Sequence, residues 1–337
     1  MALFAAEDPI GTPFRGAVGD ALRSFITGQS ERLAGIGERA ELLSELALAF
    51  TAGGKRLRPA FCWWGYQAVE ETTDLDALLR AAASLDLLHV SALMHDDVMD
   101  ASDVRRGLPA AHRQFETWHS EHGLTGSAEA FGRAGAILLG DLLLVWSMEL
   151  FTASGLPGEA LGRGLPLLDA MRTEVTCGQF LDVVAQAEPI AGVDLMDVVP
   201  RVVEFKTSRY TMIRPLQLGA ALAGGSPETL DALGRYGSAV GRAFQLRAPA
   251  TGSVRLSMGV RPSTCRSSSI ACSPSPATLS GTAARTRDKV LRCVVRQTCS
   301  RRRSPRRGLL PPGWFTSRPP RKIGARLSGA DPGPPAQ

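Results

Sequence analysis

Apolar side chains recur at helical spacing through the first 247 residues of this 337-residue chain. The clearest stripe runs from Leu75 to Leu93, and Thr73 and Asp74 precede it as residues suited to cap a helix. A second strongly apolar stretch, Ala134–Phe151, is interrupted by Asp141. Alternation with a period of two is almost absent, and the sequence contains no clear hairpin turn. This pattern predicts an all-α fold, a large helical bundle.

Shorter helical patterns fill much of the same region. They are expected around Val18–Ile26 and Ala40–Phe50, and over residues 166–187, 194–214, 216–223 and 227–246. Pro215 is expected to stop the helix over 194–214. Residues 107–133 are polar and contain glycine, so they are expected to form a connection.

The composition changes abruptly after Arg247. Residues 248–337 carry 17 Lys or Arg against two acids, and 12 of the 22 prolines, whereas residues 1–247 carry 21 basic and 31 acidic residues. We expect a helical domain over 1–247 and a disordered Arg/Ser/Pro-rich tail over 248–337, because the tail composition cannot form a packed core. Such a change without loss of length resembles translation in a shifted reading frame, and we hypothesise a frameshift near codon 248.

The N-terminus and the cysteines favour a cytoplasmic protein without a zinc site. Glu7 and Asp8 interrupt the N-terminus before an apolar signal segment forms, and the longest apolar run, Leu142–Trp146, is too short to span a bilayer. The six cysteines form no CxxC pair and no histidine follows His122, so all six are interpreted as free thiols. His95 is interpreted as an ordinary core histidine.

Three aspartates fall within five positions at the end of the first apolar helix: Asp96, Asp97 and Asp100. At helical spacing their carboxylates crowd one face, and nothing in the next turn neutralises them. Oxygen ligands without histidine or cysteine suit Mg²⁺ held jointly with a substrate phosphate. Arg105 and Arg106 follow, and arginine matches phosphate oxygens well. The pattern favours a magnesium diphosphate site over a solvated helix end, where acids would oppose the helix dipole.

A second cationic segment lies upstream, where Gly53 and Gly54 precede Lys55, Arg56 and Arg58. A two-glycine loop followed by three cations within four residues can present backbone N–H groups and positive charge to a phosphate. A solvated basic turn is the alternative interpretation.

Together these motifs resemble the trans-isoprenyl diphosphate synthases, or polyprenyl synthetases, and most of all the bacterial geranylgeranyl diphosphate synthases. The resemblance covers roughly residues 15–247, and its motifs are GGKRLRP (53–59), LLHVSALMHDDVMDASDVRRGLPAAH (87–112), GQFLDV (178–183) and EFKTSRYT (204–211). It implies the isoprenoid synthase fold, a homodimer, and a Mg²⁺-dependent prenyl transfer in isoprenoid biosynthesis. The substrates would be isopentenyl diphosphate and an allylic prenyl diphosphate.

The resemblance also implies roles for individual residues. Those for Mg²⁺ and the allylic diphosphate are Asp96 and Asp100 as metal ligands, with Asp97 and Arg105 beside them. Those for isopentenyl diphosphate are Lys55, Arg58, His89 and Arg106. Those near the leaving diphosphate are Gln179, Lys206 and Thr207, with Asp182 helping through water or metal. Gln245 matches the residue that precedes the family's second aspartate-rich motif.

Product length is expected to depend on two small residues one helical turn before the aspartates. These are Ser91 and Ala92, so no aromatic side chain closes a pocket along this helix. Farnesyl diphosphate synthases of the family often carry a bulky residue there. The resemblance therefore favours geranylgeranyl diphosphate as the product, with farnesyl or longer polyprenyl diphosphates as alternatives.

The chain departs from the family pattern after Arg247, where the second aspartate-rich motif is expected but no aspartate occurs before Asp288. We expect little or no activity as a consequence, and a non-catalytic partner subunit of a prenyl synthase is an alternative. A terpene cyclase is disfavoured because its second metal motif needs asparagine, which this sequence lacks. Specific nucleic-acid binding ranks last, because the basic tail has only Trp314 and Phe315 as aromatic residues.

Overall fold

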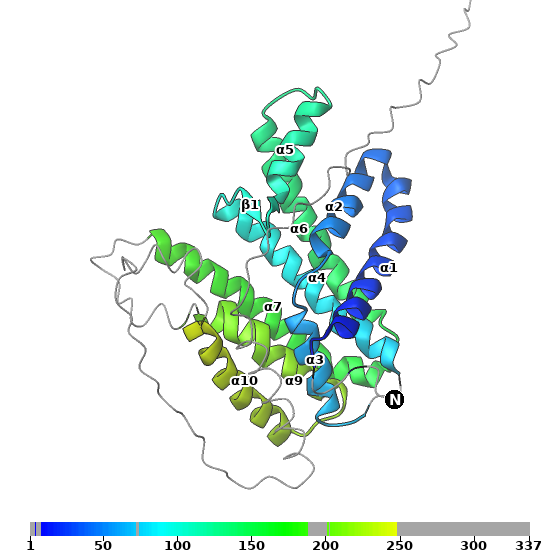
Figure 1. The fold of residues 1–337 in the computed structure, drawn as a ribbon, viewed down its shortest axis with the longest axis vertical. Coiled ribbons are helices and arrows are strands. Elements are labelled where there is room, and N and C mark those ends of the chain that lie inside the picture. The colour runs from blue at the N-terminus through cyan, green and yellow to red at the C-terminus, as the bar shows by residue number, and fades with distance from the viewer. Residues whose placement is uncertain (1–3, 5–7, 72–73, 188–200, 202, 248–337) are drawn as a thin grey trace, which may run out of the picture. The chain divides into compact units, whose positions relative to one another are not determined.

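The computed structural model describes residue 4 and residues 8–71, 74–187, 201 and 203–247, and this part of the chain is all-α, as the apolar pattern predicted (Figure 1). The α-helices are α1 (Thr12–Ile36), α2 (Glu41–Thr51), α3 (Leu57–Gln67), α4 (Leu75–Met99), α5 (Ala111–Glu121), α6 (Ala128–Thr152), α7 (Gly158–Ala187), α9 (Arg214–Leu222) and α10 (Pro227–Arg247). The other elements are a short 3₁₀ turn, η1 (Glu38–Ala40), a π-helix, η3 (Val203–Ile213), and the strands β1 (Val104–Arg105) and β2 (Leu108–Pro109). The predicted tail lies outside the described residues.

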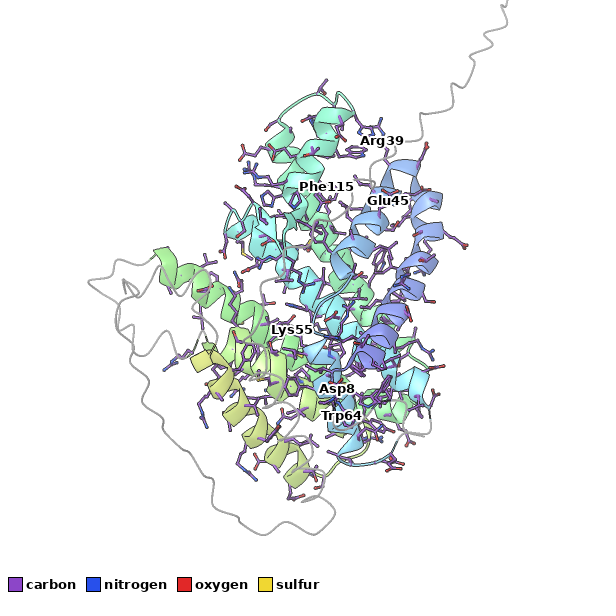
Figure 2. The ribbon with its side chains drawn as sticks, in the orientation of Figure 1. Asp8, Arg39, Glu45, Lys55, Trp64 and Phe115 are labelled. Carbon is purple, nitrogen blue, oxygen red and sulfur yellow. The ribbon has the colours of Figure 1, made fainter. Side chains whose placement is uncertain are left out.

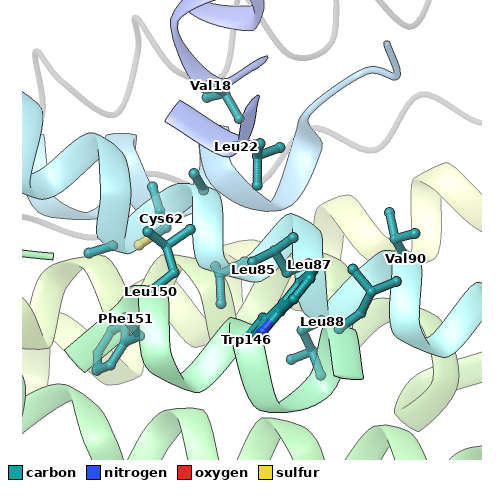
Figure 3. Close-up of a cluster of buried hydrophobic side chains, with 14 of the residues drawn as sticks. Val18, Leu22, Cys62, Leu85, Leu87, Leu88, Val90, Trp146, Leu150 and Phe151 are labelled. Carbon is teal, nitrogen blue, oxygen red and sulfur yellow. The ribbon is translucent and has the colours of Figure 1, made fainter. Parts of the chain in front are cut away.

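Helix α4 forms the core of the bundle. Asp74 caps it as predicted, since its carboxylate accepts a hydrogen bond from the Ala77 N–H at 2.9 Å. The helix packs against α1, α3 and α6, and Figure 3 shows Leu85 of α4 among side chains of these helices such as Leu22 and Trp146. Burial of each leucine contributes about 1.5–3 kcal/mol. The aspartates at the end of α4 are therefore carried by a firmly packed helix.

The predicted polar connection over residues 107–133 is wrong, because it contains α5 and the start of α6. Helix α5 buries one face against α6 through Ala111, His112, Phe115 and His119. Phe115 is the only large aliphatic or aromatic side chain in that buried set. The helical period was hidden because the rest of the face is alanine and histidine.

The structure contains one short hairpin for which the sequence contains no clear signal. Strands β1 and β2 pair antiparallel, with Val104 opposite Pro109 and Arg105 opposite Leu108. The two residues between them, Arg106 and Gly107, have φ of 54° and 84°, which is the pattern of a type I′ turn. The turn reverses the direction of the chain shortly after the aspartates of α4.

Two other boundaries differ from the sequence predictions. Pro215 does not stop a helix but lies in the first turn of α9, which follows η3 directly. Helix α7 begins at Gly158 and contains Pro166, which the sequence pattern placed at the helix start. Of the helix predicted over residues 194–214, positions 194–200 and 202 lie outside the described residues.

Helices α4 and α6 both meet a simple length and hydropathy criterion for crossing a membrane, although buried residues make up 78% of the apolar window of α4 and 44% of that of α6. Ile137, Leu138 and Val145 of α6 are exposed apolar side chains. Cys62 is a buried free thiol whose pKa burial raises to about 12, and Cys177 is an exposed free thiol. The other four cysteines lie outside the described residues.

Candidate active site

The last turn of α4 and the hairpin that follows it join an aspartate to an arginine. Asp97 is fully buried, and the Nε of Arg105 donates to its two carboxylate oxygens at 2.8 and 3.1 Å. The Nη2 of Arg105 also donates to Asp97 and lies 3.5 Å from an oxygen of Asp96. The I′ turn at Arg106 and Gly107 makes this contact possible because it folds β1 against β2. The turn after the aspartates carries no cation, as the sequence indicated, and Arg105 of the hairpin neutralises Asp97 instead.

A lysine from η3 neutralises a second aspartate. The Nζ of Lys206 donates to Asp96 at 3.1 Å and to Asp182 of α7 at 2.7 Å. Helix α7 and η3 approach closely at Gly178, where an added Cβ would lie 2.8 Å from the backbone nitrogen of Lys206. The motifs GQFLDV and EFKTSRYT thus meet the aspartates of α4. We call Asp96, Asp97, Asp100 and Asp182, with Arg105 and Lys206, the acidic half of the site.

Burial and the charges of the acidic half shift the pKa values of three of its residues. Burial and the nearby Asp96 carboxylate raise the pKa of Asp100, although Lys206 opposes the shift. Burial acts to lower the pKa of Lys206, but hydrogen bonding and charge from Asp182 and Asp96 outweigh it and raise the pKa. The hydrogen bond to Asp97 raises the pKa of Arg105. Both cations therefore remain charged at neutral pH.

The donor set of the acidic half fits Mg²⁺. Asp96 and Asp100 supply hard oxygen atoms close enough together for the charge of one to raise the pKa of the other, and a divalent cation relieves that repulsion. Among the described residues no three His, Cys, Asp or Glu side chains form a complete metal cage. Mg²⁺ often takes only one or two carboxylates when substrate phosphates and water complete its shell. Asp96 and Asp100 are thus the residues that would hold it.

The glycine-rich loop between α2 and α3 lies beside the hairpin. Gly53 and Gly54 have φ of 74° and 100°, values that favour glycine. The Nη1 of Arg106 lies 3.5 Å from the position that a Cβ on Gly54 would occupy. Lys55 is exposed in this loop (Figure 2). The loop therefore brings Lys55 and Arg106 to one region, as the phosphate hypothesis requires.

Arg58 and His89 complete this cationic region. The guanidinium of Arg58 lies 4.2 Å from the ring centre of Tyr210 and donates to the Thr211 hydroxyl at 2.7 Å. Burial lowers the pKa of Arg58, and burial with the charges of Arg58 and Arg106 holds the pKa of His89 well below 6.5. His89 is therefore neutral at pH 7, with one ring nitrogen as donor and one as acceptor. We call Lys55, Arg58, His89 and Arg106 the basic half of the site.

Two of the predicted binding residues contain buried donors without a hydrogen-bond partner among the described residues. These are the Nε of Arg58 and the Nε2 of Gln179. A buried donor without a partner costs about 1–3 kcal/mol, so both are suited to donate to a bound anion. Thr207 is half-buried in η3. Gln245 belongs to α10, and its side chain lies outside the described residues.

Arg56 differs from the two cations beside it in sequence. Its side chain is buried, pairs with Asp86 of α4, and donates to the Thr51 carbonyl at 2.6 Å. Arg56 therefore fits neither interpretation of this loop, as one of three phosphate-facing cations or as part of a solvated basic turn. Tyr210 and Asp86 were not identified from the sequence. Tyr210 follows Lys206 by four residues in a strongly polar motif, and this spacing is the one signal that points to it.

A cavity of about 490 Å³ is lined by residues of α4, α6 and α7. Ser91, Ala92 and His95 line it from α4, and Thr176 and Cys177 line it from α7. Its volume is within the usual range of small-molecule pockets. His95 is not a simple core residue, because it lines this cavity while its Nε2 lies 3.2 Å from both the Ile137 carbonyl and Asp141.

Known proteins with similar sequences and folds are prenyl diphosphate synthases. The chain is 33% identical over 196 residues to a geranylgeranyl diphosphate synthase from Methanosarcina mazei, covering 58% of this chain and 53% of that one. It is 32% identical over 210 residues to a geranylfarnesyl diphosphate synthase from Natronomonas pharaonis, covering 58% and 56%. The chain thus spans about half the length of the curated relatives it matches.

A solved structure of a prenyl diphosphate synthase also has a similar fold. A crystal structure of geranylgeranyl pyrophosphate synthase from Corynebacterium glutamicum, complexed with isoprenyl diphosphate and magnesium, superposes with a TM-score of 0.66 at 40% identity. The alignment covers 69% of this chain and 66% of that one. Residues 40–248 match the polyprenyl synthetase family, and the match ends one residue after Arg247, where the composition changes. The chain belongs to the polyprenyl synthetase family.

Proposed function

We propose that this chain binds isopentenyl diphosphate and an allylic prenyl diphosphate with Mg²⁺, and that the reaction it serves is their condensation to geranylgeranyl diphosphate. The observation that carries the proposal is the meeting of two unlike halves around α4. The acidic half offers Asp96 and Asp100 to a metal, and the basic half offers cations without a carboxylate partner among the described residues. A site for two diphosphates needs carboxylates that hold a metal for one of them and free cations that bind the other.

The proposed chemistry places negative charge on the departing diphosphate. The allylic C–O bond breaks with its electron pair on oxygen, the alkene of isopentenyl diphosphate attacks the allylic cation, and a proton then leaves to the diphosphate. Lys206 and Arg105 are charged at neutral pH and suited to stabilise the departing oxygens. Bound Mg²⁺ would supply further Lewis-acid stabilisation there. Each ~1.4 kcal/mol of such stabilisation raises the rate tenfold.

The cavity beside α4 supports the proposed product. Ser91 and Ala92 line it about one helical turn before Asp96, and their small side chains would leave room for a growing prenyl chain. Relatives at similar identity are named for both geranylgeranyl and geranylfarnesyl products. In the chain translated from the corrected reading frame, replacing Ala92 with Phe is expected to shorten the product to farnesyl diphosphate, as analysed by chromatography of dephosphorylated products. An unchanged product length would contradict this pocket assignment.

We also propose a cytoplasmic homodimer that uses the outer face of α6. The exposed apolar residues Ile137, Leu138 and Val145 lie on that helix, and burying them against a second copy removes apolar surface from water. Sedimentation should give a dimer, and replacing Leu138 and Val145 with Lys should give a monomer. A wild-type monomer at micromolar concentration would contradict the proposal.

The chain is expected to bind its ligands better than it turns them over. The family match ends at residue 248, and no aspartate follows before Asp288, so ligands for further metal ions are absent from the place where the family carries them. Product formation should be measured with labelled isopentenyl diphosphate, farnesyl diphosphate and Mg²⁺. A chain translated from the corrected reading frame is the matched control, and similar rates for both chains would contradict this expectation.

A further inference from the structure

Arg56 is the one cation of the GGKRLRP segment (53–59) that forms a buried ion pair with a carboxylate. Its side chain is 3% exposed and that of its partner, Asp86, is 8% exposed. Its backbone has a φ of 52°, in the left-handed region that residues other than glycine seldom adopt. A residue keeps such a conformation when surrounding contacts hold it there. The contacts that hold Arg56 are its ion pair with Asp86 and its hydrogen bond to Thr51.

These contacts join three elements of the site. Thr51 ends α2, Arg56 lies in the loop, and Asp86 lies in α4 one helical turn before His89. Helix α1 covers the pair, since the position of a Cβ on Gly19 lies 3.8 Å from the guanidinium of Arg56. The buried pair therefore fixes the loop to the same helix that carries His89 and the aspartates.

The neighbours of Arg56 are residues of the basic half. Lys55 precedes it directly, and Arg58 follows two residues later. The described contacts of the Arg58 side chain are to Tyr210 and Thr211 of η3, and Lys55 is exposed. The backbone between these two cations is thus held to α4 through Arg56.

We propose that the Arg56–Asp86 pair is a positioning element for the isopentenyl diphosphate subsite, and that Arg56 does not contact the ligand. This inference rests on the proposed function. Without the pair, Lys55 and the loop that leads into α3 would sample many orientations relative to Arg58, and the order lost would have to be regained on binding. The allylic subsite has its own anchors, because Asp182 holds Lys206 and Asp97 holds Arg105. Loss of the pair should therefore weaken the binding of isopentenyl diphosphate and leave the binding of the allylic diphosphate unchanged.

The decisive variant separates positioning from stability. Removing one member of a buried ion pair leaves an unpaired charge, whereas replacing both with apolar residues of similar volume is often neutral. The double variant R56M/D86L is therefore expected to fold, while it loses the hydrogen bonds that fix the loop. R56K is a second variant, which keeps the charge but cannot serve both Asp86 and Thr51 with the same geometry.

Affinities for isopentenyl diphosphate and for farnesyl diphosphate with Mg²⁺ should be measured separately by equilibrium dialysis. In R56M/D86L the affinity for isopentenyl diphosphate should fall about tenfold or more, with farnesyl diphosphate within about twofold, and R56K should lie between. R80M is the matched control, since Arg80 of α4 donates to the Ser154 carbonyl at 2.7 Å away from the loop, and it should bind both ligands as wild type does.

The outcomes distinguish this inference from the proposed function. Wild-type affinity of R56M/D86L for isopentenyl diphosphate, or an equal loss for both ligands, overturns the positioning role while leaving the proposed function intact. A wild-type chain that binds neither ligand overturns both. If R56M/D86L does not fold, R56K decides, because a folded R56K with unchanged affinity for isopentenyl diphosphate also overturns the inference.

Discussion

The acidic and basic halves of the site differ in whether their cations form ion pairs with carboxylates. In the acidic half each cation has a carboxylate partner, since Lys206 and Arg105 are both bound to aspartates of the same site. In the basic half, Lys55, Arg58 and Arg106 pair with no carboxylate in the part of the chain that the structure describes. Under the proposed function, the acidic half would exchange ion-pair partners when a ligand binds, whereas the cations of the basic half have no carboxylate partner to give up.

The comparison predicts that charge removal in the acidic half destabilises the fold. Asp97→Ala leaves the partly buried guanidinium of Arg105 without its partner and should lower the free energy of unfolding by about 3 kcal/mol. Urea denaturation measures this. Asp103→Ala is the control, because the exposed Asp103 pairs with Arg113 at the surface and should cost about 1 kcal/mol or less. Equal losses for the two variants would remove the distinction between the buried pair and a surface one.

Lys206 tests the exchange of partners directly. Lys206→Met should weaken binding of farnesyl diphosphate with Mg²⁺ by about tenfold to a hundredfold, since a charged hydrogen bond to the diphosphate is lost. Binding of Mn²⁺ without diphosphate should tighten, because the ammonium no longer competes for Asp96. Electron paramagnetic resonance of free Mn²⁺ reports the second effect. Weaker Mn²⁺ binding would show that Lys206 supports the metal site rather than competing with it.

Removing a cation from the basic half should lower the affinity for isopentenyl diphosphate without changing the free energy of unfolding. Arg106→Gln removes a cation without a carboxylate partner among the described residues, so the free energy of unfolding should stay within about 0.5 kcal/mol. The affinity for isopentenyl diphosphate should fall about tenfold. Urea denaturation and equilibrium dialysis measure the two quantities on the same sample. A large loss of stability would mean that Arg106 has a structural partner like that of Arg105.

The smallest expected effect is a pH dependence from the basic half. His89 has a lowered pKa, so below pH 6.5 the unfolded chain binds a proton that the folded chain does not, and stability falls as the pH falls. The loss should be roughly 1 kcal/mol between pH 7 and 5.5. Glu174, whose pKa Arg214 and Arg209 lower against the effect of burial, loses its contribution only below about pH 4.5.

His89→Gln tests whether His89 causes the loss of stability at low pH. His112 also has a pKa lowered by burial and contributes with the same sign, so the variant should remove part of the slope. Unfolding curves at several pH values measure the slope. An identical slope in wild type and variant would place the effect elsewhere.

The two halves also differ in how far the sequence predicted them. The cap at Asp74, the apolar stripe of α4 and the position of the aspartates at the end of that helix were predicted because capping and periodicity are local signals. The Asp97–Arg105 pair was missed because it depends on a hairpin turn at Arg106 and Gly107, a pair that is not among the usual type I′ sequences. The role of Arg56 was left open between a phosphate contact and a solvated turn, because three neighbouring cations look alike until a partner such as Asp86 is known. Contacts between distant segments therefore decided what the local pattern could not.

The most direct measurement is the number of diphosphates that one chain binds at saturation. With Mg²⁺ present, equilibrium dialysis of differently labelled farnesyl and isopentenyl diphosphates should give one of each per chain, bound at the same time. Asp96→Ala should remove the farnesyl diphosphate, and Arg58→Met should remove the isopentenyl diphosphate. Competition of the two ligands for a single site, or binding that does not depend on Mg²⁺, would contradict a site built from an acidic and a basic half.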